Sequence, residues 1–335
     1  MIRSLGSLRR HLQTAIELEH STIPPYLCAL YSIKDGTNAG AAAVIQSVVL
    51  EEMLHMALAA NVLNAIGGSP VIDHPRFVPR YPGSLPHSSG RFQVGLEKFS
   101  PRSLETFLKI EKPVRPDAPP QEGNYDTIGQ FYEAIEAGLK RLSANGECFV
   151  QDHSRQLTEE TYYGGGGAMV AVTDLDSALQ ALSEIVEQGE GIDHTIFETD
   201  ALVHGSAGYA HYFRFNEIAE GRYYAKHDAV DDAPSGPRLE IDWTSVYDMR
   251  SNPRAADHPE GSQLRRRSNE FNQTYSALLR RLHAAFNGAP SALMEAVALM
   301  YELKYQAVEL MRIPAGAGPQ TAGPPFEYAP VRTRR

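Results

Sequence analysis

The chain has 335 residues, of which 42% are hydrophobic and 21% charged, and its formal net charge is −10. This composition is that of an ordinary globular protein and argues against wholesale disorder. The excess of acidic residues also argues against nucleic acid or an anionic membrane surface as the main partner.

The sequence favours an intracellular setting. Its first residues contain neither a long apolar core nor a small-residue cleavage site, so we do not expect a secretory signal. No run approaches the roughly 18 apolar residues that a membrane span needs. Cys28 and Cys148 lie far apart and outside any C-x-x-C motif. Two buried free thiols in a reducing cytoplasm are therefore the expected state.

Apolar residues recur at helical spacing in most of the chain, which predicts a mainly α fold. The first helix contains Pro24 and Pro25, which remove two N–H donors and predict a kink or break over residues 19–23. Gly67-Gly68 followed by Pro70 predicts the end of the second helix. The predicted helices are residues 8–33, 41–66, 128–142, 174–191, 206–221, 262–287 and 291–313.

Between these helices, residues 71–127 are rich in proline, glycine and histidine, with one strand-like alternation at 92–96. We expect an ordered, loop-rich insertion that covers the bundle, because long irregular segments in compact domains are usually functional. The predicted division is a helical bundle over 1–225 that includes this insertion, an irregular linker over 226–261, a C-terminal helical hairpin over 262–313 packed on the bundle, and a tail over 314–335.

The strongest chemical signal is the E-x-x-H motif of Glu52 and His55. Residues three apart lie on neighbouring turns of one helical face, where a carboxylate and an imidazole can hold one metal ion. At 100° per residue both side chains fall within the apolar stripe that contains Val48 and Val62, whereas Glu51 falls nearer its edge. Ionisable groups at the centre of an apolar stripe are costly to bury without a partner.

The first helix repeats this pattern, because Glu19 lies at the centre of the stripe formed by Leu12, Ile16 and Ile23, while Glu17 points away. Two helices thus place a carboxylate on their inner faces, as a metal site in a bundle core requires. The alternative is a buried network of glutamate with histidine or arginine that holds no metal.

Further ligands are expected from the later helices. In helix 174–191 both Glu187 and Glu190 are candidates, and Glu190 is preferred because it lies closer to the apolar stripe. His211 shares a face with Phe215 and Ile218 and is either a ligand or an ordinary core histidine. Glu136 would replace Glu190 if the third helix supplies the ligand. Tyr26 falls on the face of Glu19 and either lines the substrate pocket or packs in the core.

A mixed carboxylate and imidazole shell suits iron, with manganese or zinc as alternatives. We expect a dinuclear centre, since two ions held about 3.5–4 Å apart activate a small molecule between them. The sequence therefore predicts an oxidoreductase that uses O₂ or peroxide on a small organic substrate. A homo-oligomer is left open.

With these residues in place, the chain resembles the ferritin-like superfamily, and more specifically the ferritin-like domain of iminophenylpyruvate dimer synthases of violacein- and indolocarbazole-type pathways. The resemblance implies a four-helix core and oxidative chemistry on an amino-acid-derived aromatic imine. One departure is Gly208, three residues before His211, where such proteins often carry a second E-x-x-H glutamate. The segments that carry the resemblance are residues 17–26, 51–56, 61–68, 185–191 and 211–215.

Two other functions remain open at this level. One is a ferritin-like metal-binding or storage protein without organic turnover, and the other is a metal-free scaffold. The long 71–127 insertion and the C-terminal hairpin favour the oxidoreductase, because a storage shell usually uses a shorter chain.

Overall fold

The structure is a computed structural model that describes residues 2–115, 118–144, 146, 148–162, 165–191, 195–203 and 206–330. It is mainly helical, as predicted from the sequence. Its elements are α1 (Leu5–Ser32), α2 (Ala39–Ala65), α3 (Pro101–Ile110), α4 (Ile128–Ala144), α5 (Leu175–Glu190), β1 (Phe197–Val203), β2 (Ser206–Tyr209), α6 (His211–Glu220), α7 (Gln263–Phe286) and α8 (Ala292–Met311), with a short 3₁₀ turn at Ala255–Asp257.

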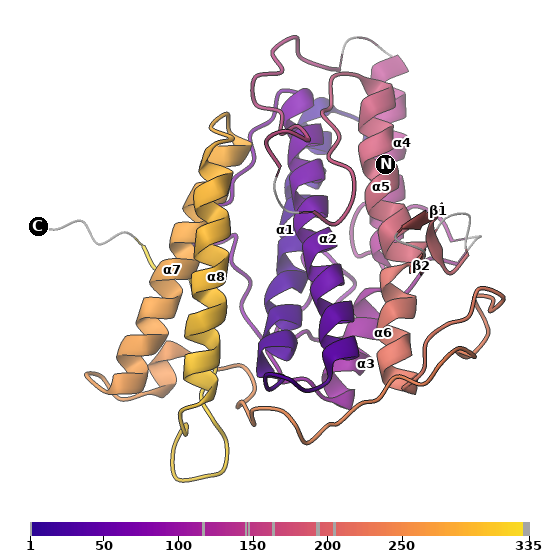
Figure 1. Cartoon of the computed structure of the whole chain (residues 1–335). Coiled ribbons are helices and arrows are strands. Elements are labelled where there is room, and N and C mark those ends of the chain that lie inside the picture. Colours follow the sequence, from indigo (N-terminus) through magenta and orange to yellow (C-terminus); the bar gives the residue numbers. More distant parts are fainter. Residues whose placement is uncertain are drawn as a thin grey trace, which may run out of the picture.

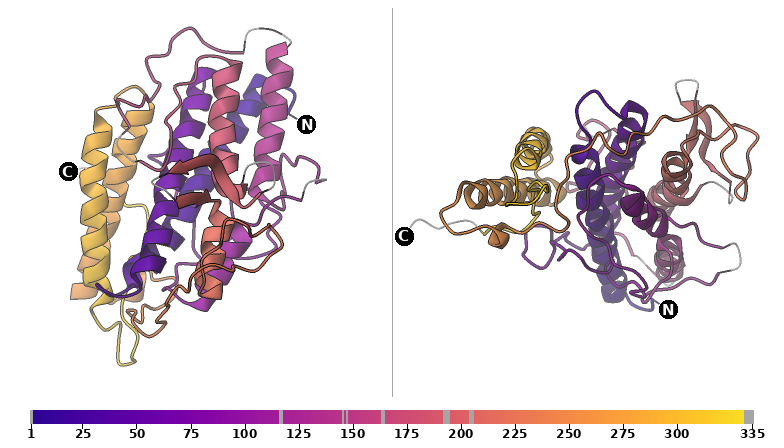
Figure 2. Two further views of the ribbon diagram at one scale, coloured as in Figure 1. Left: turned by 45° about the vertical axis from the view of Figure 1, so that its right-hand side comes forward. Right: turned by 90° about the horizontal axis from the view of Figure 1, so that it is seen from below.

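The helices form three layers, with the α1–α2 pair in the middle (Figures 1 and 2). The C-terminal hairpin α7–α8 packs against one side of this pair, through α1 and α2. Helices α3 to α6 pack against the other side. The central pair therefore has two buried faces, and each can contribute side chains to a different site.

The third and fourth positions of the bundle are each filled by two short helices. Helix α1 contacts both α3 and α4, and α2 contacts both α5 and α6. In Figure 1, α4 and α5 form the upper part of this layer and α3 and α6 the lower part. The antiparallel β1–β2 hairpin lies between α5 and α6 in the chain. Both composite helices are thus interrupted near mid-height, so helix termini fall inside the bundle.

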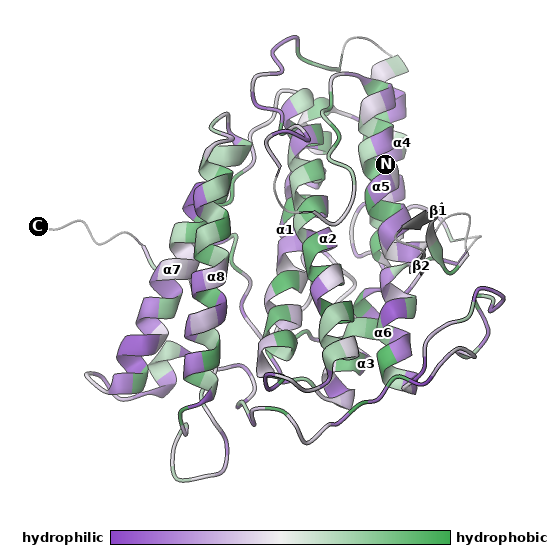
Figure 3. Ribbon diagram, viewed as in Figure 1, coloured by the Kyte–Doolittle hydropathy of each residue, from purple (hydrophilic) through white to green (hydrophobic). Residues whose placement is uncertain are grey.

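Helix α2 is the core of the molecule. It is long and apolar enough to span a membrane by composition, which corrects the expectation that no such segment exists. Most of it is buried inside the bundle, as is usual for the core helix of a globular domain. Figure 3 shows apolar residues along much of α1 and α2, with more polar residues on α7. The buried polar residues of α2 include Glu51, Glu52 and His55.

Of the kink or break predicted from Pro24 and Pro25, the break does not occur, because α1 is continuous through both prolines. The backbone carbonyl of Ser21 loses its helical donor because Pro25 has no N–H. The hydroxyl of Tyr81, from the loop-rich insertion, donates to that carbonyl at 2.8 Å. The insertion therefore supplies the hydrogen bond that the helix itself lacks.

Three local predictions are wrong. Residues 92–96 form no strand, since Val94 makes only an isolated bridge with Gly83. The insertion contains a helix, α3, that begins at Pro101 with a Ser100–Ser103 capping box, a start signal that the sequence analysis overlooked. Residues 206–209 form β2 rather than helix, so α6 begins at His211. Gly208 lies in β2. Because a glycine within a helix costs about 1 kcal/mol, this residue disfavours the helix that was predicted here.

The C-terminal hairpin forms where the sequence predicts it, with Ser262 capping α7. The segment that follows α8 returns to pack on α7. Phe326 is buried against Phe271 and Tyr275, at ring-centroid distances of 4.9 and 5.2 Å. The described part of the predicted tail is therefore attached to the hairpin, while residues 331–335 lie outside the described residues.

Replacing Tyr81 with phenylalanine tests the link between the insertion and the proline-containing turn of α1. The variant leaves a buried carbonyl without its donor, so we expect a loss of about 1–3 kcal/mol in the free energy of unfolding. Urea titration followed by circular dichroism measures it. Tyr328→Phe is the control, because Tyr328 donates to Asp73 at a half-exposed site and should cost about 0.5 kcal/mol or less. Equal losses in both variants would contradict the prediction.

Candidate metal centre

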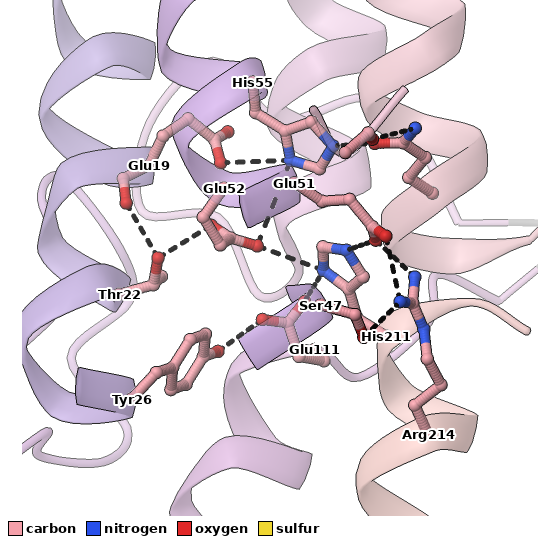
Figure 4. Close-up of polar contacts among 12 residues, drawn as sticks. Glu19, Thr22, Tyr26, Ser47, Glu51, Glu52, His55, Glu111, His211 and Arg214 are labelled. Atoms are coloured by element: carbon pink, nitrogen blue, oxygen red, sulfur yellow. Dashed lines mark hydrogen bonds and ion pairs between the residues drawn. The ribbon is translucent and has the colours of Figure 1, made fainter. Parts of the chain in front are cut away.

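Five buried side chains meet at the centre of the bundle (Figure 4). They form two groups of potential ligands, in each of which one atom per residue lies within 4.8 Å of the others. The first group is Glu19, Glu52 and His55, and the second is Glu52, Glu111 and His211. Glu52 belongs to both groups, which is the arrangement that a carboxylate shared between two ions requires.

Each residue is positioned by a different feature of the fold. Glu19 lies on the inner face of α1, and Glu52 and His55 lie one turn apart on α2. Glu111 is the C-cap of α3, and His211 is the first residue of α6. The last two residues reach the centre because the composite helices are interrupted at this level.

Both histidines turn Nδ1 toward the carboxylates and Nε2 away from them. His55 Nε2 lies 2.8 Å from Oε1 of Gln188, and His211 Nε2 lies 2.8 Å from Oε2 of Glu51. Because these oxygens can only accept, both Nε2 atoms carry the hydrogen. In the neutral rings this leaves the Nδ1 lone pairs directed into the cluster, the usual state of a metal-binding histidine.

His211 gives the clearest sign that the cluster fits a metal. Its Nδ1 atom is completely buried and has no hydrogen-bond partner among the described residues. This atom lies 3.0 Å from a Glu52 carboxylate oxygen and 3.4 Å from one of Glu111. A buried nitrogen without a partner, surrounded by carboxylate oxygens, is the donor set that a cation would complete.

The carboxylates are held by hydroxyl groups on the outer side of the cluster. The Thr22 hydroxyl lies 2.7 Å from both a Glu52 carboxylate oxygen and the backbone carbonyl of Glu19, so its one hydrogen is shared between these two acceptors. The phenol of Tyr132, on α4, donates to Glu19, and that of Tyr26 donates to Glu111. Each carboxylate thus has one oriented hydrogen bond, which fixes the side chain as second-layer partners do in metal sites.

Glu51 is part of this support rather than a solvent-facing residue. It accepts hydrogen bonds from His211 and from the guanidinium of Arg214, which also donates to Ser47 at 2.9 Å. Burial raises the pKa of Glu51, but the charge of Arg214 and the contacts with His211 together outweigh this effect and lower the pKa to about 2. Glu51 is therefore a fixed anion that orients His211.

Without a metal ion, the negative charge of the clustered carboxylates is poorly balanced. Burial, followed by the charge of Glu111, raises the pKa of Glu52 to about 7. For His55, burial lowers the pKa, but the hydrogen bond and charge of Glu19 raise it overall. Burial also lowers the pKa of His211, while contacts with three carboxylates, that of Glu111 first, raise it well above its usual value. The metal-free cluster thus retains protons that a metal ion would displace.

A chamber of about 20 Å³ lies beside the cluster, with Glu190 in its wall. The Glu190 carboxylate accepts from the backbone N–H groups of Gly129, at 2.9 Å, and Val114, at 3.1 Å, and so caps the start of α4. A Cβ atom at Gly129 would lie 2.3 Å from a Glu190 oxygen, so only glycine leaves room for this contact. Burial raises the pKa of Glu190 to about 7.

The other predicted site residues lie further out. Glu187 accepts from Ser183 at 2.6 Å on the outer side of α5, and the structure does not bring it to the cluster. Glu136 pairs with Lys140 on the exposed side of α4, which removes it as a replacement for Glu190. Tyr26 is fully buried behind Glu111, against Phe107 and Phe215, and does not line the chamber.

Sequence reasoning missed Glu111, Glu51 and Tyr132. Glu111 directly follows the capped helix α3, so recognising the Ser100-Pro101 start signal would have placed a carboxylate at a helix end. The helical phase predicts only that Glu51 lies nearer the edge of the stripe, and it does not reveal that Arg214 and His211 face it. Tyr132 gives no signal beyond an apolar position on α4.

The chain belongs to the Ferritin-like family, which matches residues 12–220. Two curated relatives are a dichlorochromopyrrolate synthase from Lentzea aerocolonigenes, 25% identical over 87% of this chain, and a 2-imino-3-(indol-3-yl)propanoate dimerase from Chromobacterium violaceum, 27% identical over 99% of it. The chain spans only 30% and 35% of their respective lengths. These findings confirm the resemblance expected from the sequence.

A solved structure of a ferritin-like protein from Caulobacter vibrioides has the same fold. The TM-score is 0.68 at 24% sequence identity, and the match covers 98% of this chain and 99% of that one. The shared fold therefore extends beyond the bundle to the C-terminal hairpin.

Gln188→Leu tests whether the support of His55 controls metal binding. Loss of the Nε2 partner should weaken metal affinity by about 10–100-fold, as is typical for such supporting residues. Calorimetric titration with Mn²⁺ measures the affinity. Glu187→Gln, one residue away and facing outward, is the matched control and should bind as the parent protein does. Unchanged affinity in Gln188→Leu would contradict the proposed role.

The protonation of the cluster predicts how the metal-free protein responds to pH. Glu52 and Glu190 have pKa values raised from 4.5 to about 7, so the folded chain binds more protons than the unfolded chain in this window. Their stabilising contribution is complete below about pH 4.5 and is lost as the pH rises through about 7. The raised pKa values of both histidines act in the same direction.

We therefore expect the Tm of the metal-free protein to fall between about pH 6 and about pH 8. The fall should be smaller in Glu190→Gln and in the metal-loaded protein, and differential scanning calorimetry measures all three. A Tm that rises over this range in the metal-free protein would contradict the prediction.

Proposed function

We propose that this protein is a dinuclear iron oxidoreductase that uses O₂ or peroxide to oxidise a small aromatic substrate derived from an amino acid. The observation that carries the proposal is the pair of ligand groups sharing Glu52, with both histidine Nδ1 atoms directed inward. Together with Glu190, the set contains four glutamates and two histidines from all four bundle positions, as in ferritin-like carboxylate centres.

In this proposal Glu19 and His55 would hold one ion, Glu111 and His211 would hold the other, and Glu52 would contribute to both. Manganese or zinc would fit the same donors, but iron suits the redox chemistry. A bound iron pair would supply the chemistry that reduces O₂ or peroxide. The substrate would provide the electrons and protons for this reduction. Glu190, with a pKa of about 7 and a place in the chamber wall, is positioned to take up or release a proton.

The chamber volume restricts what reaches the centre. About 20 Å³ accommodates a molecule the size of water or O₂, but no aromatic ring system. Gly189 also lines this chamber, and a side chain there would meet open space. We infer that an organic substrate approaches from the Gly189 side. The substrate class is suggested by the name of the relative that dimerises 2-imino-3-(indol-3-yl)propanoate.

The small chamber also favours a second candidate, a ferritin-like protein that binds or stores metal without organic turnover. The two candidates share the metal centre and differ in the fate of an organic substrate. For either, we infer a cytoplasmic location, which is supported by two buried free thiols, Cys28 and Cys148.

The test is anaerobic loading with Fe²⁺ followed by O₂. We expect about two iron ions per chain and a new absorption band of oxidised iron. The Glu52→Ala/His55→Ala double variant should lose both, whereas Glu187→Ala should keep both. A parent protein that binds no iron, or forms no band, would contradict the metal proposal.

The organic step is tested by supplying the imine of indolepyruvate, generated in situ from tryptophan, with and without catalase. Iron-dependent formation of a coupled product, detected by mass spectrometry, supports the oxidoreductase. Gly189→Leu should slow this reaction but not the reaction of iron with O₂. Iron oxidation with no change in the imine, together with a hollow many-subunit assembly in light scattering, would support the storage protein instead.

A further inference from the structure

A second, much larger cavity lies on the other side of the α1–α2 pair. Its volume is about 480 Å³, within the range of small-molecule sites. Its walls come from α1 and α2 on one side and from the α7–α8 hairpin on the other, the two layers seen apart in Figure 2. Its lining is mainly apolar and includes Leu27, Met53, Leu279 and Met300.

This cavity is separate from the candidate metal centre. On α1, Glu19 faces the chamber and its neighbour His20 faces the cavity, and on α2 the same holds for Glu52 and Met53. No described residue lines both spaces. Successive residues on a helix point about 100° apart, so one helical pair can serve two sites.

Two buried polar atoms at this cavity lack partners among the described residues: Nδ1 of His20 and the hydroxyl of Tyr162. His20 is 4% exposed, and its Nε2 atom lies 2.7 Å from the hydroxyl of Tyr275. An unpaired buried polar group costs about 1–3 kcal/mol. Water held in the cavity beside a guest would satisfy these atoms.

The mouth of the cavity carries positive charge. Lys34, at the end of α1, and Lys304, on α8, both border the cavity and are exposed. Asp35 also lies at this end, but its carboxylate is 3.6 Å from the guanidinium of Arg312, which offsets its charge. The mouth therefore suits an anionic group.

The cavity is also elongated. Its lining extends along α1 from His20 to Tyr31, about 16 Å of the helix axis, and continues past the end of α1 to Lys34. An indole or phenyl acid would fill only part of this length. A long unbranched chain fits both the length and the apolar lining.

We propose that the cavity between α1–α2 and α7–α8 binds a long-chain carboxylic acid, with the carboxylate at Lys34 and Lys304 and the chain extending inward past His20. This site is independent of the metal centre. It gives the C-terminal hairpin a role as one wall of a lipid-binding pocket.

Binding is tested with cis-parinaric acid, a fluorescent polyunsaturated fatty acid, titrated into the full chain. We expect saturable binding of about one molecule per chain, displaced by hexadecanoic acid, and the same affinity in Glu52→Ala/His55→Ala. Leu279→Trp, which fills the cavity, should weaken binding about tenfold or more. Its unfolding midpoint is measured to confirm that it folds.

Surface variants test the site without disturbing the core. Lys34→Glu/Lys304→Glu should weaken binding of the acid by about threefold or more, but leave binding of its methyl ester unchanged. Lys140→Glu, an exposed lysine on α4, is the matched control and should have no effect.

Three results would overturn the proposal. One is the absence of saturable binding, and a second is equal loss of acid and ester binding in the lysine variant. The third is tighter binding of indole-3-pyruvic acid than of hexadecanoic acid. A dimer seen by analytical ultracentrifugation that excludes the probe would also overturn it, because a second chain would then occupy this face.

Discussion

The structure depends on the burial of several carboxylates in the core of a helical bundle. Glu19, Glu52 and Glu111 converge in the buried core, where like charges so close together repel strongly. Hydroxyl groups satisfy the outer oxygens and two histidines face the inner ones. A fixed charge pair of Glu51 with Arg214 steadies one of those histidines. What remains uncompensated is negative charge at the centre, and cations are the natural complement.

This constraint also explains why two helix positions are interrupted. A continuous helix presents ligands only at three- or four-residue spacing, but a helix end adds free backbone groups and changes the chain direction. Glu111 follows the end of α3, Glu190 is the last residue of α5, and His211 begins α6. The N–H groups that hold Glu190 come from Val114, in the loop after α3, and from Gly129, at the start of α4.

Sequence reasoning found the residues whose positions follow from one continuous helix. Glu19, Glu52 and His55 were selected by phase alone, and the structure brings them together. Sequence reasoning was less successful for site residues whose positions depend on how separate segments of the chain pack together. The sequence analysis noted only that Gly208 stands where a second E-x-x-H glutamate is often found, because spacing within one helix could not show that α5 ends beside α6. Likewise, no periodic signal connects Glu111, at the end of a short helix, with His211 a hundred residues later.

The interruption between Glu190 and His211 has a mechanical consequence. Helices α5 and α6 lie in one bundle position but are not continuous, since the described residues between them include the β1–β2 hairpin. Ions held by both ligand groups would clamp α6 to α1, α2 and α3 through His211 and Glu111. Metal would then hold α6 in its bundle position, as an unbroken backbone does in a continuous helix.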